Sequence, residues 1–221
     1  MASAGPRREP VGDATCATPA GRGTARCQVL LGHQHRFGKG VTSDPVEALR
    51  LYRLAADQGD GDGQYELAAM LASGQAGHKD EFEALRWYRK AADQGHARAQ
   101  NRLGLAYENG SGVPKNLVLA AQWYRLAADQ GLSSAQHNLG RLYLRGQGVF
   151  KDSAKAAALL HQAAAQGEPN AKFHLGRMYE TGEGLPRDRQ QAARLYREAL
   201  AGTSLSERNR EAAKALLAAP P

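Results

Sequence analysis

The 221-residue sequence is poor in cysteine, in aromatic residues and in long apolar stretches. Its two cysteines, Cys16 and Cys27, both precede the first complete repeat described below, so no disulfide is expected to brace the repeats themselves. No stretch approaches the roughly 18 apolar residues of a membrane-spanning helix, and the N-terminus lacks the apolar run of a secretory signal. These shortages argue against a membrane span and a disulfide-braced scaffold. They predict a cytoplasmic protein, with export or import into an organelle left open.

Acidic residues are in the minority, because 22 Asp and Glu stand against 29 Lys and Arg and give a formal net charge of +7. The first 40 residues alone carry +4 of that charge, so the repeats are nearly balanced. Nucleic-acid binding requires a concentrated basic surface that neutralises phosphates. The near-balance of the repeats therefore disfavours a nucleic-acid partner, although an anion-binding or nucleic-acid-binding array stays an alternative.

Residues 1–26 are rich in Gly, Pro, Thr, Ala and Arg and contain almost nothing apolar to bury. This composition predicts a disordered N-terminal segment. Two other interpretations stay open, namely a weak transit-like leader and a start placed too far upstream.

The chain repeats itself every 36 residues, most visibly in a tyrosine column that is interrupted once by leucine. A period between about 20 and 50 residues indicates stacked supersecondary units rather than one globular core. The function is therefore expected on a repeated surface. The members of the tyrosine column are Tyr52, Tyr88, Tyr124, Leu160 and Tyr196.

Each repeat contains a helix, here called helix A, that begins after a polar N-cap residue. Pro45, directly after the first cap, suits the first helical position. Alanine and bulky residues follow at spacings of 3, 4 and 7 and define one apolar helical face, and a glycine then ends the helix. The N-caps are Asp44, Asp80, Asn116, Asp152 and Asp188, and the terminating glycines are Gly59, Gly95, Gly131 and Gly167.

A second helix, here called helix B, follows a short turn and reads A-Q-H-N-L-G-R-L-Y at residues 135–143. Its internal glycine recurs as Gly104, Gly140 and Gly176. Because glycine in a helix costs about 1 kcal/mol relative to alanine, this recurrence predicts a close approach by a neighbouring helix. A G-x-G turn ends helix B.

The ends of the repeat region depart from the pattern. Residues 27–41 match only a helix B, so the predicted organisation is a half repeat at 27–41 and then units of 36 residues up to residue 202. A C-terminal capping helix and tail are expected at 203–221. The weakest unit spans 60–77, where the run Asp60-Gly61-Asp62-Gly63 predicts a polar, hinge-prone turn.

Taken together, the pattern A-x-x-W-Y-R-x-A-A-D-Q-G at 120–131 and A-x-x-x-L-G-x-x-Y-x-x-G-x-G-V at 135–149 resembles the Sel-one-like repeat (SLR) family, relatives of the tetratricopeptide repeat. The resemblance covers about residues 27–202. It implies an all-α fold, an α/α right-handed superhelix (solenoid) of tandem helix-turn-helix repeats with helices A on the inner surface. It also implies adaptor and scaffold roles, often in bacterial signalling, secretion-linked or host-interaction complexes. Some members carry disulfides within each repeat, which this sequence lacks, and a few have been linked to β-lactam binding.

A column of arginines directly follows the tyrosine column on helix A, and a second set lies one turn earlier. On an inner surface these guanidinium groups would bind the carboxylates of a partner segment. The alternative is that Asp57, Asp93 and Asp129, four residues further on, pair with the arginines and leave a solvated face. The candidate partner-binding residues are Arg50, Arg53, Arg86, Arg89, Arg125, Arg194 and Arg197, with His161 interrupting the column.

Aromatic and metal-ligating residue types have simpler explanations. Trp87 and Trp123 fall among the alanine columns, so we expect core residues rather than a ligand-stacking platform. The spacing of Cys27, His33 and His35 matches no standard zinc site, and the acidic turn at 60–63 lacks the later ligands of a calcium loop. We therefore expect no metal and no cofactor.

Catalytic signatures are also missing, since the sequence contains no G-x-S-x-G, S-x-x-K, H-E-x-x-H or C-x-x-C motif. The histidines are scattered over unrelated columns, and His137 and His174 are interpreted as surface polar residues. We predict a non-enzymatic scaffold or adaptor that binds a partner peptide or protein segment on the concave helix-A face. Phe82, Val118 and either Leu54 or Leu126 would add apolar contacts. The alternative, from the resemblance alone, is a β-lactam or cell-wall hydrolase.

Overall fold

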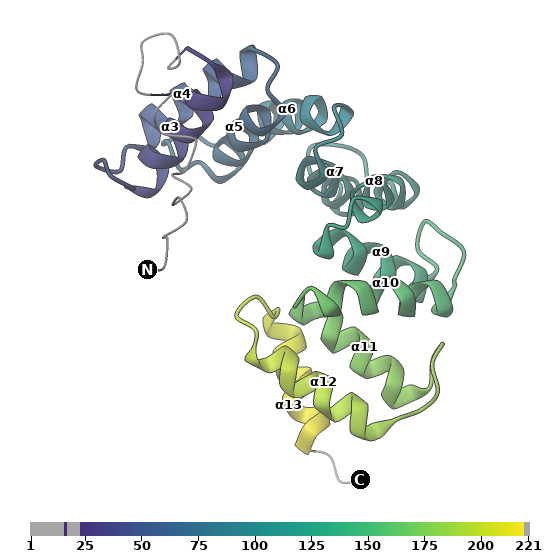
Figure 1. The fold of residues 1–221 in the computed structure, drawn as a ribbon. Helices are drawn as coiled ribbons and strands as arrows, with labels where there is room; N and C mark the ends of the chain where they lie inside the picture. The colour runs from purple at the N-terminus through teal and green to yellow at the C-terminus, as the bar shows by residue number, and fades with distance from the viewer. Residues whose placement is uncertain (1–15, 17–22, 219–221) are drawn as a thin grey trace, which may run out of the picture. The chain divides into compact units, whose positions relative to one another are not determined.

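The computed structural model describes residue 16 and residues 23–218, and this part of the chain is all-α, with paired helices and no strand (Figure 1). The predicted fold of tandem helix-turn-helix repeats is confirmed. Most of the segment 1–26, for which we predicted disorder, lies outside the described residues. Every described helix is too short or too polar to traverse a lipid bilayer.

The chain divides into two compact units, at residues 1–96 and 97–221. The first contains α3 (Ala25–Phe37), α4 (Pro45–Asp57), α5 (Gly61–Ser73) and α6 (Glu81–Asp93). The second contains α7 (Ala97–Asn109), α8 (Leu117–Asp129), α9 (Ser133–Arg145), α10 (Ser153–Ala165), α11 (Pro169–Thr181), α12 (Arg189–Ala201) and α13 (Glu207–Ala218). The even-numbered helices are the predicted helices A, and the odd-numbered helices up to α11 are the predicted helices B.

The predicted N-caps and glycine stops of helix A are confirmed. Each cap side chain accepts a hydrogen bond from a first-turn backbone N–H, as Asp80 does from Glu83 at 2.8 Å. The four glycines after α4, α6, α8 and α10 have φ of 86–89°, a left-handed conformation that side chains with a Cβ rarely adopt. Local sequence chemistry therefore sets both ends of these helices.

The tyrosine column packs against the internal glycines of helix B. Tyr52, Tyr124 and Leu160 are fully buried, and a Cβ added at Gly104 would lie 2.5 Å from two ring carbons of Tyr124. The glycine therefore leaves room for the ring of the following helix A. Leucines of helix B complete the same core, in a column made of Leu67, Leu103, Leu139 and Leu175.

A ladder of paired glutamines, which the sequence pattern alone did not predict, ties helix B to the following helix A. The residue that caps the C-terminus of helix A donates its side-chain amide to a buried glutamine of helix B, at 2.7–2.9 Å. In the fifth pair an ion pair at 2.9 Å between Lys172 and Glu198 joins α11 to α12 instead. The donor and acceptor pairs are Gln58 and Gln28, Gln94 and Gln64, Gln130 and Gln100, and Gln166 and Gln136.

Two local predictions need correction. The run Asp60-Gly61-Asp62-Gly63 is not a hinge-prone turn, because Asp60 caps α5 by accepting from the Gly63 N–H at 2.7 Å and the helix begins at Gly61. Trp87 and Trp123 are half-buried rather than core residues. The Lys90 ammonium lies 3.9 Å from the ring centroid of Trp87 and shields it from water.

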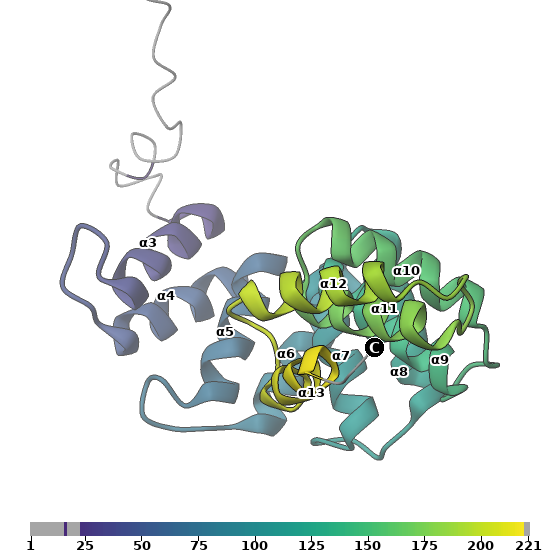
Figure 2. The same ribbon diagram turned by 90° about the horizontal axis from the view of Figure 1, so that it is seen from below.

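A disulfide at one end of the described chain and helix packing at the other stabilise the terminal repeats. A disulfide joins Cys16 to Cys27, so the expectation that neither cysteine braces the repeats is wrong for α3. At the other end α13 packs on α12 and α11 and covers the last pair (Figure 2). Disulfides are more typical of oxidising compartments than of the cytosol, and the cytoplasmic location stays a prediction.

Candidate functional site

The seven arginines predicted to bind a partner are all exposed on helices A, at Arg50 and Arg53 of α4, Arg86 and Arg89 of α6, Arg125 of α8, and Arg194 and Arg197 of α12. In the first unit Arg53 reaches Glu83 of α6, with 2.9 Å between the guanidinium and the carboxylate. Each unit therefore presents guanidinium groups to solvent, as the regular spacing predicted.

The arginines pair differently from the predicted alternative. Of the three pairs expected four residues apart, Arg89 with Asp93 forms, at 3.0 Å. Arg53 instead pairs with Glu83, and Arg125 donates to the Tyr143 hydroxyl at 2.6 Å. These exposed contacts contribute little to stability, because surface ion pairs are worth about 0–1 kcal/mol.

The other arginines of the set fall into two groups. Arg50 donates twice to Glu47, and this hydrogen bond lowers the pKa of the Glu47 carboxyl. Arg194 donates to Glu198 at 3.0 Å. Arg86 and Arg197 make no ion pair or side-chain hydrogen bond with any residue that the structure describes. The positive charges of the helix-A arginines are therefore only partly neutralised by carboxylates of the chain itself.

Large apolar side chains are exposed on the same helices. In the first unit Phe82 is 73% exposed, with Val46 and Leu54 also at the surface. In the second unit Val118 is 54% exposed and Leu126 is 48% exposed. Val46, Phe82 and Val118 share one repeat column, so each of these helices begins with an exposed apolar residue beside its arginines.

The helix-B side of the second unit contains a different arrangement. A pocket of about 160 Å³ opens between α9 and α11, with Arg141, Arg145, His174 and Arg177 in its lining. His174 stacks on His137, with the ring centroids 5.3 Å apart. Both rings are half-buried, so the prediction that these histidines are surface polar residues is wrong.

Burial is the main cause of the unusual protonation of these two rings. It lowers the pKa of His137 to about 4, and it lowers the pKa of His174 to about 3 together with the neighbouring positive charges. Both imidazoles are therefore neutral at pH 7. The Nε2 atom of His137 is buried without a hydrogen-bond partner among the described residues.

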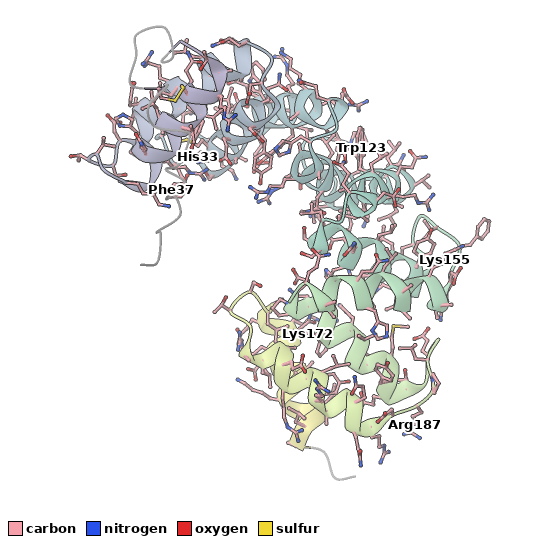
Figure 3. The ribbon with its side chains drawn as sticks, in the orientation of Figure 1. His33, Phe37, Trp123, Lys155, Lys172 and Arg187 are labelled. Atoms are coloured by element: carbon pink, nitrogen blue, oxygen red, sulfur yellow. A yellow bond between two sulfur atoms is a disulfide. The ribbon has the colours of Figure 1, made fainter. Side chains whose placement is uncertain are left out.

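In Figure 3, Trp123 of α8 and Lys155 of α10 lie on one side of the second unit, and Lys172 of α11 lies on the other. No cluster of three or more potential metal ligands occurs in the part of the chain that the structure describes. His33, one of the weak metal candidates, instead shares a 3.0 Å hydrogen bond with the Tyr52 hydroxyl.

The model of the Sel1 repeat matches residues 25–60, 61–96, 97–132, 133–168 and 169–204 in succession. The chain belongs to the Sel1 repeat family. Each matched Sel1 repeat begins with helix B and ends after the following helix A, so the repeats coincide with the pairs α3–α4, α5–α6, α7–α8, α9–α10 and α11–α12. The five N-caps of helix A therefore lie in the middle of the five repeats.

Solved Sel1 repeat structures resemble the whole array. A Sel1 repeat protein from Oxalobacter formigenes is 30% identical with a TM-score of 0.80, over 93% of this chain and 91% of that one. The protein c5321, a protective antigen present in uropathogenic Escherichia coli strains, is also 30% identical, with a TM-score of 0.74, over 90% of this chain and 47% of that one.

A more distant structure shows the fold alone. Immunity protein Pa5087 from Pseudomonas aeruginosa is 24% identical with a TM-score of 0.54, over 82% of this chain and 70% of that one. No functionally curated protein matches the chain.

Sequence reasoning missed the pocket of this Sel1 repeat chain because its residues come from different columns. Arg141 and Arg177 are 36 residues apart and both follow the L-G pair of helix B, which is a signal that the sequence contained. At the repeat positions of Arg145, His137 and His174, the other repeats have different residue types. Only the packing of α9 beside α11 brings them together.

Proposed function

We propose that this Sel1 repeat protein is a non-enzymatic scaffold that binds a peptide or protein segment of a partner on its helix-A surfaces. The observation that carries the proposal is the exposure of Phe82 and Val118 beside exposed arginines. Exposed apolar side chains rimmed by polar groups are typical of protein-binding surfaces. Membership of the Sel1 repeat family supports the same class of function.

The chemistry of the surface suits a partner segment with both apolar and acidic residues. Apolar contacts with Phe82 or Val118 would supply affinity, because burying such a side chain contributes about 1.5–3 kcal/mol. Arg86 and Arg197 have no acceptor among the described residues and are available to a partner's carboxylates. We place such complexes in bacterial signalling, secretion-linked or host-interaction processes.

Affinity capture from the native cell, with the captured protein identified by mass spectrometry and then purified, provides the binding assay. The charge reversals Arg86→Glu and Arg197→Glu change one exposed arginine in each unit and should together weaken binding by at least about thirtyfold, the scale of an interface hot spot. Phe82→Ser should do the same. The helical circular-dichroism melt should stay unchanged, because all three side chains are exposed.

Matched controls separate this surface from the rest of the chain. Phe150→Ser removes a phenylalanine that is 97% exposed but precedes α10, and it should leave binding unchanged. Arg187→Glu together with Lys115→Glu reverses two exposed charges outside the helices and should also have no effect. Undiminished binding by the helix-A variants would refute the proposed surface. Turnover of a chromogenic β-lactam by the purified protein would refute the non-enzymatic assignment.

A further inference from the structure

The pocket between α9 and α11 is basic and only partly apolar. Leu144 and Met178 supply apolar walls, while Arg141, Arg145 and Arg177 supply guanidinium groups. The side chains of Thr181, His174 and Glu183 complete the lining. The pocket is lined by helices B and by Glu183 after α11, whereas the arginines proposed to bind a partner belong to helices A.

The carboxylates near the pocket are already engaged. Glu108 of α7 accepts both short contacts from the Arg141 guanidinium, at 2.5 and 2.7 Å, and both side chains are largely buried. Glu183 pairs with Lys151 at 2.7 Å and accepts from the Ser153 hydroxyl, and these contacts lower the pKa of its carboxyl. Both carboxylates are therefore hydrogen-bonded to other cations, and Arg177 acts on Glu183 through its charge alone.

Arg145 and Arg177 lack such acceptors. Their guanidinium groups make no ion pair or side-chain hydrogen bond with any residue between 23 and 218 or with Cys16. Arg208 of α13 lies close enough to Arg145 to repel it, and burial and the positive charge of its neighbours lower the pKa of the Arg145 guanidinium. Like charges held together at a concave site attract an anion from solution.

We propose that this pocket binds an oxyanion, either a carboxylate or a phosphate group, between the guanidinium groups of Arg145 and Arg177. A guanidinium presents its N–H donors as a planar fork that matches two oxygens of one carboxylate or phosphate. The neutral imidazole of His174 faces the same pocket and can donate one N–H to the anion. With a volume of about 160 Å³, the pocket has room for one such group.

The oxyanion has two possible sources, a free ion or an acidic side chain of a polypeptide. Isothermal calorimetry of the full chain at low ionic strength distinguishes them with two probes, inorganic phosphate and an acetylated, amidated peptide of alternating Glu and Ala. Binding of phosphate identifies a free-anion site. Binding of the peptide alone identifies a polypeptide carboxylate as the ligand. Binding of neither probe overturns the proposal.

The double substitution Arg145→Gln with Arg177→Gln should reduce the affinity for the probe that binds by at least about tenfold, since both charged donors to the anion are lost. The control Lys115→Gln with Arg189→Gln removes two exposed positive charges at the starts of α8 and α12 and should change the affinity less than about twofold by screening alone. Circular dichroism checks that both proteins fold. Equal affinity in the two double variants would overturn the assignment of the site.

Discussion

Replacement of Gly104 by alanine should destabilise the second unit, whereas the same replacement at Gly140 should not. The added Cβ at Gly104 would lie 2.5 Å from two carbons of the Tyr124 ring, which is fully buried and cannot move aside. At Gly140 the corresponding neighbour is Leu160, whose Cγ would lie 3.1 Å away. A branched aliphatic side chain can shift by a few tenths of an ångström to relieve the contact, while a rigid, fully buried ring cannot.

The magnitudes follow from two opposing effects. Alanine gains about 1 kcal/mol over glycine inside a helix. Overpacking of a well-filled core costs about 1–3 kcal/mol, and the contact with the Tyr124 ring lies at the upper end. Gly104→Ala should therefore lower the free energy of unfolding by about 2 kcal/mol, and Gly140→Ala should change it by less than about 1 kcal/mol.

Urea denaturation followed by circular dichroism measures both effects, and a double-mutant cycle tests the cause. Tyr124→Leu copies the pairing found one repeat later, so combined with Gly104→Ala it should cost less than the sum of the two single changes by about 2 kcal/mol. A Gly104→Ala protein as stable as Gly140→Ala would refute the reasoning. Additive costs in the cycle would refute the assigned contact.

Three further predictions concern stability. Gln166→Ala should lower the free energy of unfolding by about 1–2 kcal/mol although Gln166 is exposed, because the buried side-chain oxygen of Gln136 loses its hydrogen-bond donor. Adding Gln136→Leu should restore part of the lost free energy of unfolding, as measured by urea denaturation. Because burial lowers the pKa of His137 to about 4 and that of His174 to about 3 in the folded state, the free energy of unfolding should decline as the pH drops from about 6.5 to 4, by about 3 kcal/mol for each ring. A pH series on His137→Asn should show about half of the decline of the unmodified protein, because His174 remains, and an undiminished decline in the variant would contradict the assignment to His137. Cys16→Ser should lower stability by about 2–3 kcal/mol, the scale for closing a short loop, and a reductant should then have no further effect on melting.

Much of the fold could be predicted because each helix is specified locally. The N-caps, the glycine stops and the apolar spacing of helix A act over a few residues, so the 36-residue repeat displays them directly. The burial of the tyrosine column followed from the same spacing. The prediction failed for Asp60, where a polar run formed a helix start, and for the two tryptophans, which are only half-buried.

The candidate site was predictable only in part. The exposure of Arg86 and Phe82 follows from their places on the helix opposite the alanine columns. The actual partner of Arg53 is a residue of the next repeat, Glu83, rather than the nearby Asp57. Side-chain pairing depends on the distance between neighbouring helices, which the order of residues along one helix does not contain.

The sequence by itself determined the repeat, its helix boundaries and its family, because these depend on periodic local chemistry. The tertiary structure decided which residues from different columns meet. The stacked His137 and His174, the arginines around them and the glutamine ladder are each produced by packing between different helices. Burial and neighbouring charge then give those residues properties that no single column displays.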